Sequence, residues 1–376
     1  METKSWTPEH VARARRYQMR RLGLDLLASA AEFAVTAALL ALAPRGGWPL
    51  PGGSLLLAGA IYFALLAAAR RAAALPLDYL GSFRLPHSEG LSNEALGGWL
   101  LDRAKGLALL LLIGCPAAGA LLALMASRPG DWWWIAAALG TALGATLALL
   151  APVVLAPLFF RFKPLSDPAL RERLEGLLRR TGARMAGGVW EMDLSRKSRT
   201  ANAALVGWGP SRRVVLSDTL LEYAPEEIEA VLAHEIAHHV GRHIPRLLLL
   251  RAAMLAVGFY LAQELLDRPG LVAWAGLAPL PAGEPAALAF LWLLFTAWGA
   301  VLSPFLLAHA RRLERWCDRF AVRHAGGGEG LARALAKLCE KNLADPAPPR
   351  WVVALFHAHP PLGERIRRVR EEGGRA

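Results

Sequence analysis

Six long apolar stretches constrain the fold of this 376-residue chain more than any other feature of its sequence. About 20 apolar residues in an α-helix cross the hydrocarbon core of a bilayer. Charged residues make up only 20% of the chain, and the apolar residues are gathered in blocks rather than at amphipathic spacing. We therefore expect a multi-pass α-helical membrane protein in a lipid bilayer, with spans at about 22–43, 54–74, 105–127, 132–155, 246–266 and 286–309.

The distribution of basic residues predicts the orientation of these spans. With the N-terminus inside the cell, the outer loops 44–53, 128–131 and 267–285 contain only three of the 43 Lys and Arg residues, namely Arg45, Arg128 and Arg268. Basic residues accumulate on the cytoplasmic side of membrane proteins. We expect both termini and the active site to face the cytoplasm of a bacterial inner membrane. The net charge of +12 then needs no nucleic-acid partner.

The first span is expected to stay in the mature protein. Ala41-Leu42-Ala43 imitates the cleavage site of a secretory signal, but Asp25 and Glu32 interrupt the apolar run before it. The predicted organisation is a basic cytoplasmic N-terminus 1–21, four spans within 22–155 with a cytoplasmic connector 75–104, a first part of a protease domain 156–245, two spans within 246–309, and a second part of that domain 310–376.

The polar segments predict local structure of mixed type. The pattern of the connector 75–104 predicts short helices at the membrane interface, and that of 156–245 predicts an α+β unit. Pro225, followed by two glutamates, is typical of the start of a helix, which should feed the fifth span with a kink at Pro245. The expected helix and strands of the α+β unit are 167–181, 188–192, 203–206 and 213–217.

A metal-binding pattern stands in the helix that begins at Pro225. His234-Glu235-Ile236-Ala237-His238 matches H-E-x-x-H, in which two histidines about 6 Å apart along one helix face can bind one Zn²⁺. Glu235, turned around the axis, is the expected general base. The alternative is a surface helix that is rich in histidine, since His239 and His243 are also four residues apart.

A hydrolytic zinc ion needs a third protein ligand and an open position. Glu314, on the helix after the sixth span, is our candidate, and Asp318 one turn later could orient a ligand histidine through its second nitrogen. The alternative for this stretch is a solvated charged face. The three cysteines are too few and too scattered for a thiolate site and read as buried hydrophobes: Cys115, Cys317 and Cys339.

Several longer segments resemble the integral-membrane zinc metalloproteases of the CAAX prenyl protease 1 type. They include LPLDYLGSF, GLSNEALGGWLLDRAKG, LAPLFFRFKPLSDPALR, SRKSRTANAALVGWGPSRRVVLSDTLLE and FHAHPPLGERI, besides HEIAHHVGRH and ERWCD. The resemblance implies a helical barrel around a hydrated chamber, closed at its cytoplasmic end by an α+β zinc domain that binds one Zn²⁺ per chain. It gives His234, His238 and Glu314 as metal ligands, Glu235 as catalytic acid and Asp318 as their outer carboxylate.

The resemblance also implies three contacts with the substrate. Asn202-Ala203 resembles the edge strand that holds substrate by backbone pairing, although the residues alone fit an interior strand equally well. His359 resembles a late histidine that donates to the oxyanion, and Arg365 resembles a residue that fixes substrate nearby. The alternative for these two residues is a turn and a basic helix face.

The predicted function is a zinc-dependent membrane endopeptidase whose partners are peptide or membrane-protein substrates. The composition is typical of a bacterial protein, and most bacteria do not prenylate proteins, so prenyl specificity is not carried over. One alternative is a quality-control protease of membrane proteins. Another is a non-catalytic metal-binding transporter or scaffold, because polar residues lie in or beside the spans: Asp25, Glu32, Gln263 and Glu264. The sequence leaves the oligomeric state open.

Overall fold

The computed structural model describes residues 6–43, 53–183, 187–207, 212–268, 270, 280–281 and 283–375. Within these residues six helical segments are long and apolar enough to cross a membrane, which confirms the expected number of spans. They are α1 Pro8–Ala41, α2 Leu55–Asp78 with its continuation to Ser88, α4 Leu96–Ser127, α5 Trp132–Leu150 with its continuation to Leu158, α8 His243–Leu266 and α10 Ala287–His324.

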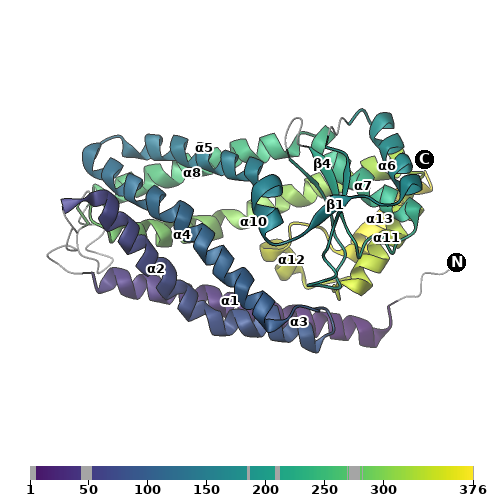
Figure 1. The fold of residues 1–376 in the computed structure, drawn as a ribbon, viewed down its shortest axis with the longest axis horizontal. Helices are drawn as coiled ribbons and strands as arrows, with labels where there is room; N and C mark the ends of the chain where they lie inside the picture. The colour runs from purple at the N-terminus through teal and green to yellow at the C-terminus, as the bar shows by residue number, and fades with distance from the viewer. Residues whose placement is uncertain are drawn as a thin grey trace.

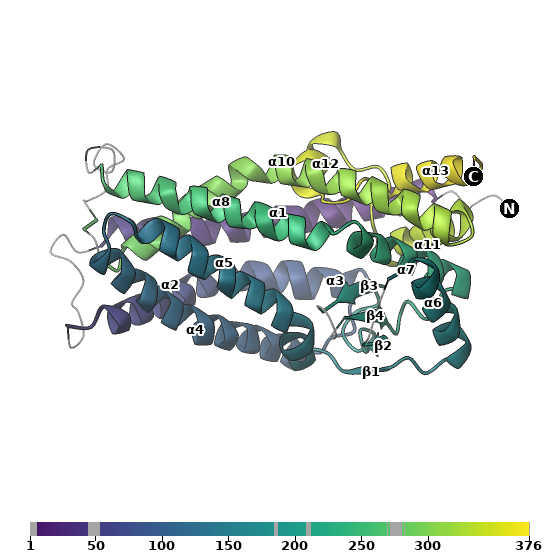
Figure 2. The same ribbon diagram turned by 90° about the horizontal axis from the view of Figure 1, so that it is seen from above.

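The six segments form a closed ring. Each helix contacts the next in the order α1, α2, α4, α5, α8 and α10, and α10 returns to α1 (Figures 1 and 2). The expected helical barrel is therefore present. Helices α2 and α4 approach each other closely, because a Cβ atom on Gly119 would lie 2.3 Å from the backbone oxygen of Leu56. Glycine at this position lets the two backbones meet.

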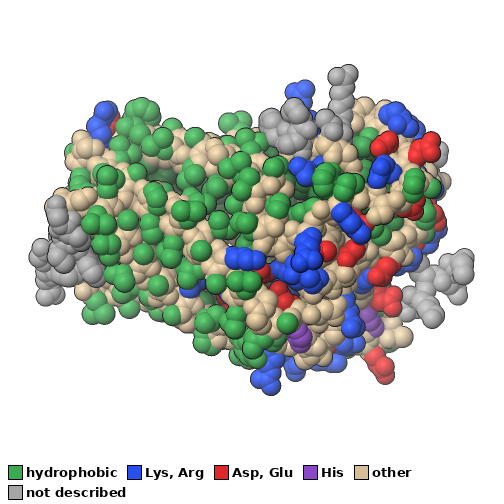
Figure 3. Space-filling view, viewed as in Figure 1, with side chains coloured by type: hydrophobic (Ala, Val, Ile, Leu, Met, Phe, Trp, Pro, Cys, Tyr) green, Lys and Arg blue, Asp and Glu red, His purple; other side chains and the backbone are tan. Residues whose placement is uncertain are grey.

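The outer surface of the barrel suits a lipid environment. Large apolar side chains point outward from its helices, including Leu112, Leu249 and Phe305 at 71%, 74% and 72% exposure. Apolar side chains cover the barrel half of the molecule in Figure 3, and most charged side chains gather over the other half. An apolar belt of this extent would not stay exposed to water.

The other half is a small α+β domain that both parts of the chain build. Its sheet has the order β1-β2-β4-β3, in which β2 and β4 are parallel and the outer pairs antiparallel. Leu174 and Leu232 from the first part share one buried core with Leu331 and Val369 from the second. The elements are β1 Phe162–Pro164, α6 Pro168–Arg180, β2 Val189–Met192, β3 Ala203–Val206, β4 Arg213–Ser217, α7 Pro225–Val240, α11 Gly328–Lys341, α12 Arg350–Phe356 and α13 Leu362–Gly373.

Strands β2, β3 and β4 and helix α6 agree with the expected ranges, whereas β1 was not expected. The sequence left open whether 203–206 is an interior or an edge strand, and among the described residues β3 is an edge strand. The short run Phe-Lys-Pro of β1 carries too little alternation to be recognised as a strand before its pairing with β2 is known.

Two expectations about the helices were wrong. The connector 75–104 is not a set of short interfacial helices, because α2 continues through a π-helix at Tyr79–Arg84 and α3 Leu85–Ser88. The helix from Pro225 does not kink at Pro245 but ends at Val240, and α8 begins at His243 after Arg242 adopts a left-handed φ of 51°. Pro245 then falls in the first turn of α8, where its missing N–H costs no helical bond.

One expected domain boundary does not coincide with the end of a helix. The division at 309/310 falls inside α10, a single 38-residue helix that runs from the barrel into the α+β domain. The expected outer loops 44–53 and 267–285 lie mostly outside the described residues.

The contact between α2 and α4 gives a prediction for stability. Gly119→Ala should lower the free energy of unfolding by about 1–3 kcal/mol, because the added methyl group has no room beside Leu56. Gly106→Ala on the same helix is the matched control, since no atom lies within 4 Å of the added Cβ. Thermal unfolding in detergent measures both. Equal melting temperatures for the two variants would contradict the close approach.

Candidate active site

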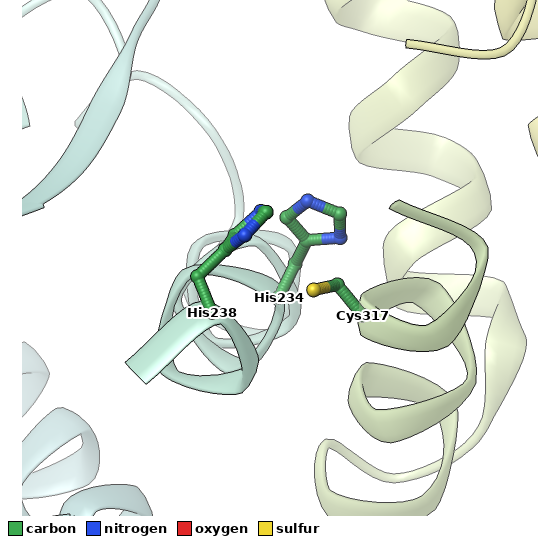
Figure 4. Close-up of side chains that lie close together, drawn as sticks. All are labelled: His234, His238 and Cys317. Carbon is green, nitrogen blue, oxygen red and sulfur yellow. The ribbon is translucent and has the colours of Figure 1, made fainter. Parts of the chain in front are cut away.

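Helices α7 and α10 bring two histidines and a carboxylate together. Nε2 of His234 lies 3.2 Å from Oε2 of Glu314, and Nε2 of His238 lies 3.2 Å from Oε1 of the same residue. The histidines are one helical turn apart on α7, as the spacing predicted. Figure 4 shows both imidazoles rising from α7 beside the neighbouring helix α10. The expected partners His234, His238 and Glu314 thus meet at one point.

This donor set fits a divalent metal ion. Ligand atoms about 2.0–2.1 Å from a tetrahedral Zn²⁺ lie about 3.3 Å from one another, close to the two separations found here. Oε2 of Glu314 is buried and accepts no well-directed hydrogen bond, although Nε2 of His234 is its neighbour. A bound cation would satisfy a buried carboxylate oxygen of this kind.

Cys317 is a second neighbour of the two histidines. Its sulfur and one ring nitrogen from each of His234 and His238 lie within 4.8 Å of one another (Figure 4). Sγ of Cys317 also lies 3.8 Å from Nδ1 of His243. Nε2 of both histidines lies closer to the carboxylate of Glu314, which favours Glu314 over Cys317 as the third ligand. The side chain of Cys317 is fully buried.

The outer nitrogen of His234 has a carboxylate partner, as the sequence predicted for Asp318. Nδ1 of His234 lies 2.9 Å from Oδ1 of Asp318. Burial opposes protonation of this ring, but the neighbouring carboxylates of Asp318 and Glu314 raise the pKa of His234 to about 9. Both carboxylates therefore hold the imidazole in a fixed orientation between them.

Arg365 has a contact that the sequence did not reveal. Its guanidinium donates to both carboxylate oxygens of Asp318, at 2.9 and 2.6 Å, and the residue is only 7% exposed. Nη1 of Arg365 also lies 4.0 Å from Oε2 of Glu314. The predicted contact with substrate stays a prediction, whereas the contacts that are present fix Asp318. Only the packing of α13 against α10 brings these residues together, and no sequence spacing signals it.

The remaining predicted residues line one cavity of about 550 Å³, which includes Glu235, Asn202, Ala203, His359 and Arg365. Burial is the main cause that raises the pKa of Glu235, which brings its proton affinity closer to that required of a base near neutral pH. His359 is 62% exposed along its side chain, and its Nε2 lies 3.5 Å from Oε2 of Glu314. Glu235 and His359, which border the two histidines and Glu314, therefore connect that cluster with the cavity.

His243 is a neighbour of the site to which the sequence assigned no role. The pattern suggested a pair with His239 on a continuous helix, but the break between α7 and α8 separates them. Nδ1 of His243 lies 3.1 Å from Nδ1 of His238 instead. His239 turns away, with Nε2 3.0 Å from Nη1 of Arg212.

Two family descriptions together match nearly the whole chain. Peptidase family M48 matches residues 164–373, and the family described as CAAX prenyl protease N-terminal, five membrane helices, matches residues 3–161. The second match contains four of the six candidate spans found in the described residues. The M48 match includes every residue of the candidate site.

Individual proteins agree with this assignment. The uncharacterized metalloprotease YhfN of Bacillus subtilis is 26% identical over 299 residues, which cover 79% of this chain and 70% of the relative. The CAAX prenyl protease 1 homolog of Homo sapiens is 27% identical over 336 residues, covering 79% and 70%. The crystal structure of S. mikatae Ste24p shares the fold, with a TM-score of 0.82 over 96% of this chain and 89% of that one, at 24% identity.

The M48 match covers more than half of the chain, and the barrel, the α+β domain and the convergence of α7 and α10 are present together. This chain belongs to peptidase family M48 and is a multi-pass membrane metallopeptidase.

Proposed function

We propose that this protein is a zinc-dependent endopeptidase that cleaves peptides or membrane-protein segments at the cytoplasmic face of a bacterial inner membrane. The observation that carries the proposal is the approach of the Nε2 atoms of His234 and His238 to the carboxylate of Glu314, beside a cavity that Glu235 lines. Two imidazoles, one carboxylate and an open side form a donor set of hydrolytic zinc enzymes. The charge distribution between loops supports the orientation.

Each residue of the site would have a separate role in peptide hydrolysis. When bound to His234, His238 and Glu314, zinc supplies a Lewis acid that polarises the scissile carbonyl and makes water more acidic. Glu235 takes the proton of the attacking water and delivers it to the leaving amine. His359 donates from Nε2 to the developing oxyanion. Asp318 accepts the Nδ1 proton of His234, which leaves the Nε2 lone pair for the ion, and Arg365 holds Asp318.

The substrate would pair with the free edge of β3. The N–H of Ser217 on β4 donates to the carbonyl of Asn202 at 2.9 Å. Backbone groups alternate in direction along an antiparallel strand, so those of Ala203 face away from β4. Ala203 also lines the cavity that contains Glu235. Recognition through the main chain suits an enzyme that accepts extended peptides of varied sequence.

A transporter is a weaker explanation of the polar residues in the spans. Glu32 is paired with Arg70 at 2.5 Å, and the amide of Gln263 donates to the carbonyl of Pro129 at 2.7 Å. Glu264 is paired with Arg268. Each of these three side chains has at least one partner within the protein, so no ion path is needed to explain its place in or beside a span.

Replacing the proposed base should separate catalysis from metal binding. Glu235→Gln should retain zinc but lose peptidase activity by a factor on the order of 10²–10⁴, because the amide cannot accept the proton of water. Peptide hydrolysis and metal content of the purified protein are measured together. Near-normal activity in a variant that retains its zinc would remove Glu235 from this role.

Comparison of two neighbours on α10 tests the third ligand. Glu314→Gln should weaken zinc binding by more than about 100-fold, beyond the effect of losing an outer partner. Cys317→Ala, which lies on the same helix, should bind zinc nearly as tightly as the unchanged protein. Competition with a chromophoric chelator gives both dissociation constants. A larger loss in Cys317→Ala than in Glu314→Gln would assign the ligand to sulfur.

A proline on β3 tests backbone pairing with substrate. Ala203→Pro should lower kcat/KM by about 2- to 10-fold through loss of one outward donor, without lowering the melting temperature. Ala204→Pro is the matched comparison, because it removes a donor that faces β4 and should also destabilise the domain. An unchanged kcat/KM in folded Ala203→Pro would argue against pairing at this residue. Assay of a farnesylated peptide beside its unmodified form separates prenyl specificity from main-chain recognition.

A further inference from the structure

The two histidines of the H-E-x-x-H pattern differ in what contacts their outer nitrogens. Nδ1 of His234 faces a carboxylate oxygen of Asp318 at 2.9 Å, whereas Nδ1 of His238 faces Nδ1 of His243 at 3.1 Å. His243 is 3% exposed, so water does not compete freely for this contact. A histidine that binds a metal ordinarily has a partner on its second ring nitrogen, and that partner fixes its tautomer.

The break between α7 and α8 is what brings His243 to this position. In a continuous helix a residue five positions after His238 would lie about 7.5 Å further along the axis and on another face. Here α7 ends at Val240, and Arg242 with a φ of 51° redirects the chain, so that His243 turns back onto His238. A left-handed conformation at a residue other than glycine or asparagine is uncommon and costs free energy.

Packing around His243 then fixes its ring. A Cβ atom on Gly241 would lie 2.5 Å from Nε2 of His243 and 2.9 Å from the ring of Trp316, so only glycine leaves room for this arrangement. The imidazole of His243 also meets the indole of Trp316 edge-on, with ring centroids 5.3 Å apart. Three consecutive features of the chain, namely Gly241, Arg242 and His243, thus serve one contact with His238.

We propose that His243 is a positioning residue that accepts the Nδ1 proton of His238 and thereby directs the Nε2 lone pair of His238 toward the metal position. This inference rests on the metal site proposed above. In this arrangement His243 carries its own proton on Nε2 and offers Nδ1 as the acceptor. His243 does for His238 what Asp318 does for His234, with a neutral ring in place of a carboxylate.

Two substitutions distinguish this role from simple packing. His243→Phe keeps an aromatic ring against Trp316 but has no acceptor. His243→Asn has a smaller side chain that fills less space, but its amide oxygen can take the place of Nδ1. If His243 acts as an acceptor, Asn preserves zinc affinity better than Phe; if it acts only as packing, the order is reversed. His239→Phe is the matched control, because His239 contacts Arg212 and not the metal ligands.

The experiment measures zinc binding rather than turnover. Full-length proteins in detergent are stripped of metal and titrated with Zn²⁺ against a chromophoric chelator, and Co²⁺ absorption spectra report ligand geometry. We expect His243→Phe to raise the zinc dissociation constant by about 10- to 100-fold. His243→Asn and His239→Phe should stay within about threefold of the unchanged protein. If His243→Phe does not fold, as judged by the melting temperature of the metal-free protein, His243→Leu replaces it.

The outcomes separate this inference from the proposed function. If the unchanged protein binds one zinc and His243→Phe binds it equally tightly, the inference about His243 is wrong and the metal site stands. If Asn weakens binding as much as Phe, the acceptor role is also wrong. If the unchanged protein takes up no stoichiometric zinc, the proposed function itself fails, and this inference fails with it.

Discussion

The approach of α7 to α10 is the interaction on which the rest of the site depends. It sets the carboxylate of Glu314 opposite the two imidazoles of α7, and it joins the two parts of the α+β domain into one core. Because α10 is also the sixth helix of the barrel, the same rigid element belongs to both halves of the molecule. The position of the candidate active site is therefore fixed relative to the apolar belt.

Buried charge explains why the site contains more polar residues than a metal ion requires. Glu314, Asp318 and Arg365 are each at most 7% exposed. An isolated buried charge is costly. Removing one member of a buried ion pair leaves the other charge uncompensated and lowers the free energy of unfolding by about 3–5 kcal/mol. Arg365 balances Asp318 and Asp318 orients His234, while Oε2 of Glu314 accepts no well-directed hydrogen bond. A bound cation would complete this balance, so we expect metal binding to stabilise the domain.

Local patterns in the sequence predicted the structural features that are determined within a single segment. The six spans follow from runs of apolar residues, and the pairing of His234 with His238 follows from the pitch of one helix. The edge position of β3 and the contact of Arg365 with Asp318 depend on how distant segments pack, so composition and spacing could not give them. The continuous helix expected through Pro245 was wrong for a similar reason, since a left-handed Arg242 is a feature that tertiary contacts must stabilise.

The break at Arg242 has a mechanical consequence for the whole enzyme. Helix α8 starts at His243, in contact with His238, and continues through the barrel between α5 and α10. Helix α10 carries Glu314 and continues through the barrel between α8 and α1. Residues of two of the ring's helices, His243 of α8 and Glu314 of α10, therefore contact the same histidine, one at each ring nitrogen. A shift of either helix by about 1 Å would disturb contacts of this length, so we expect the proposed metal site to require an intact barrel.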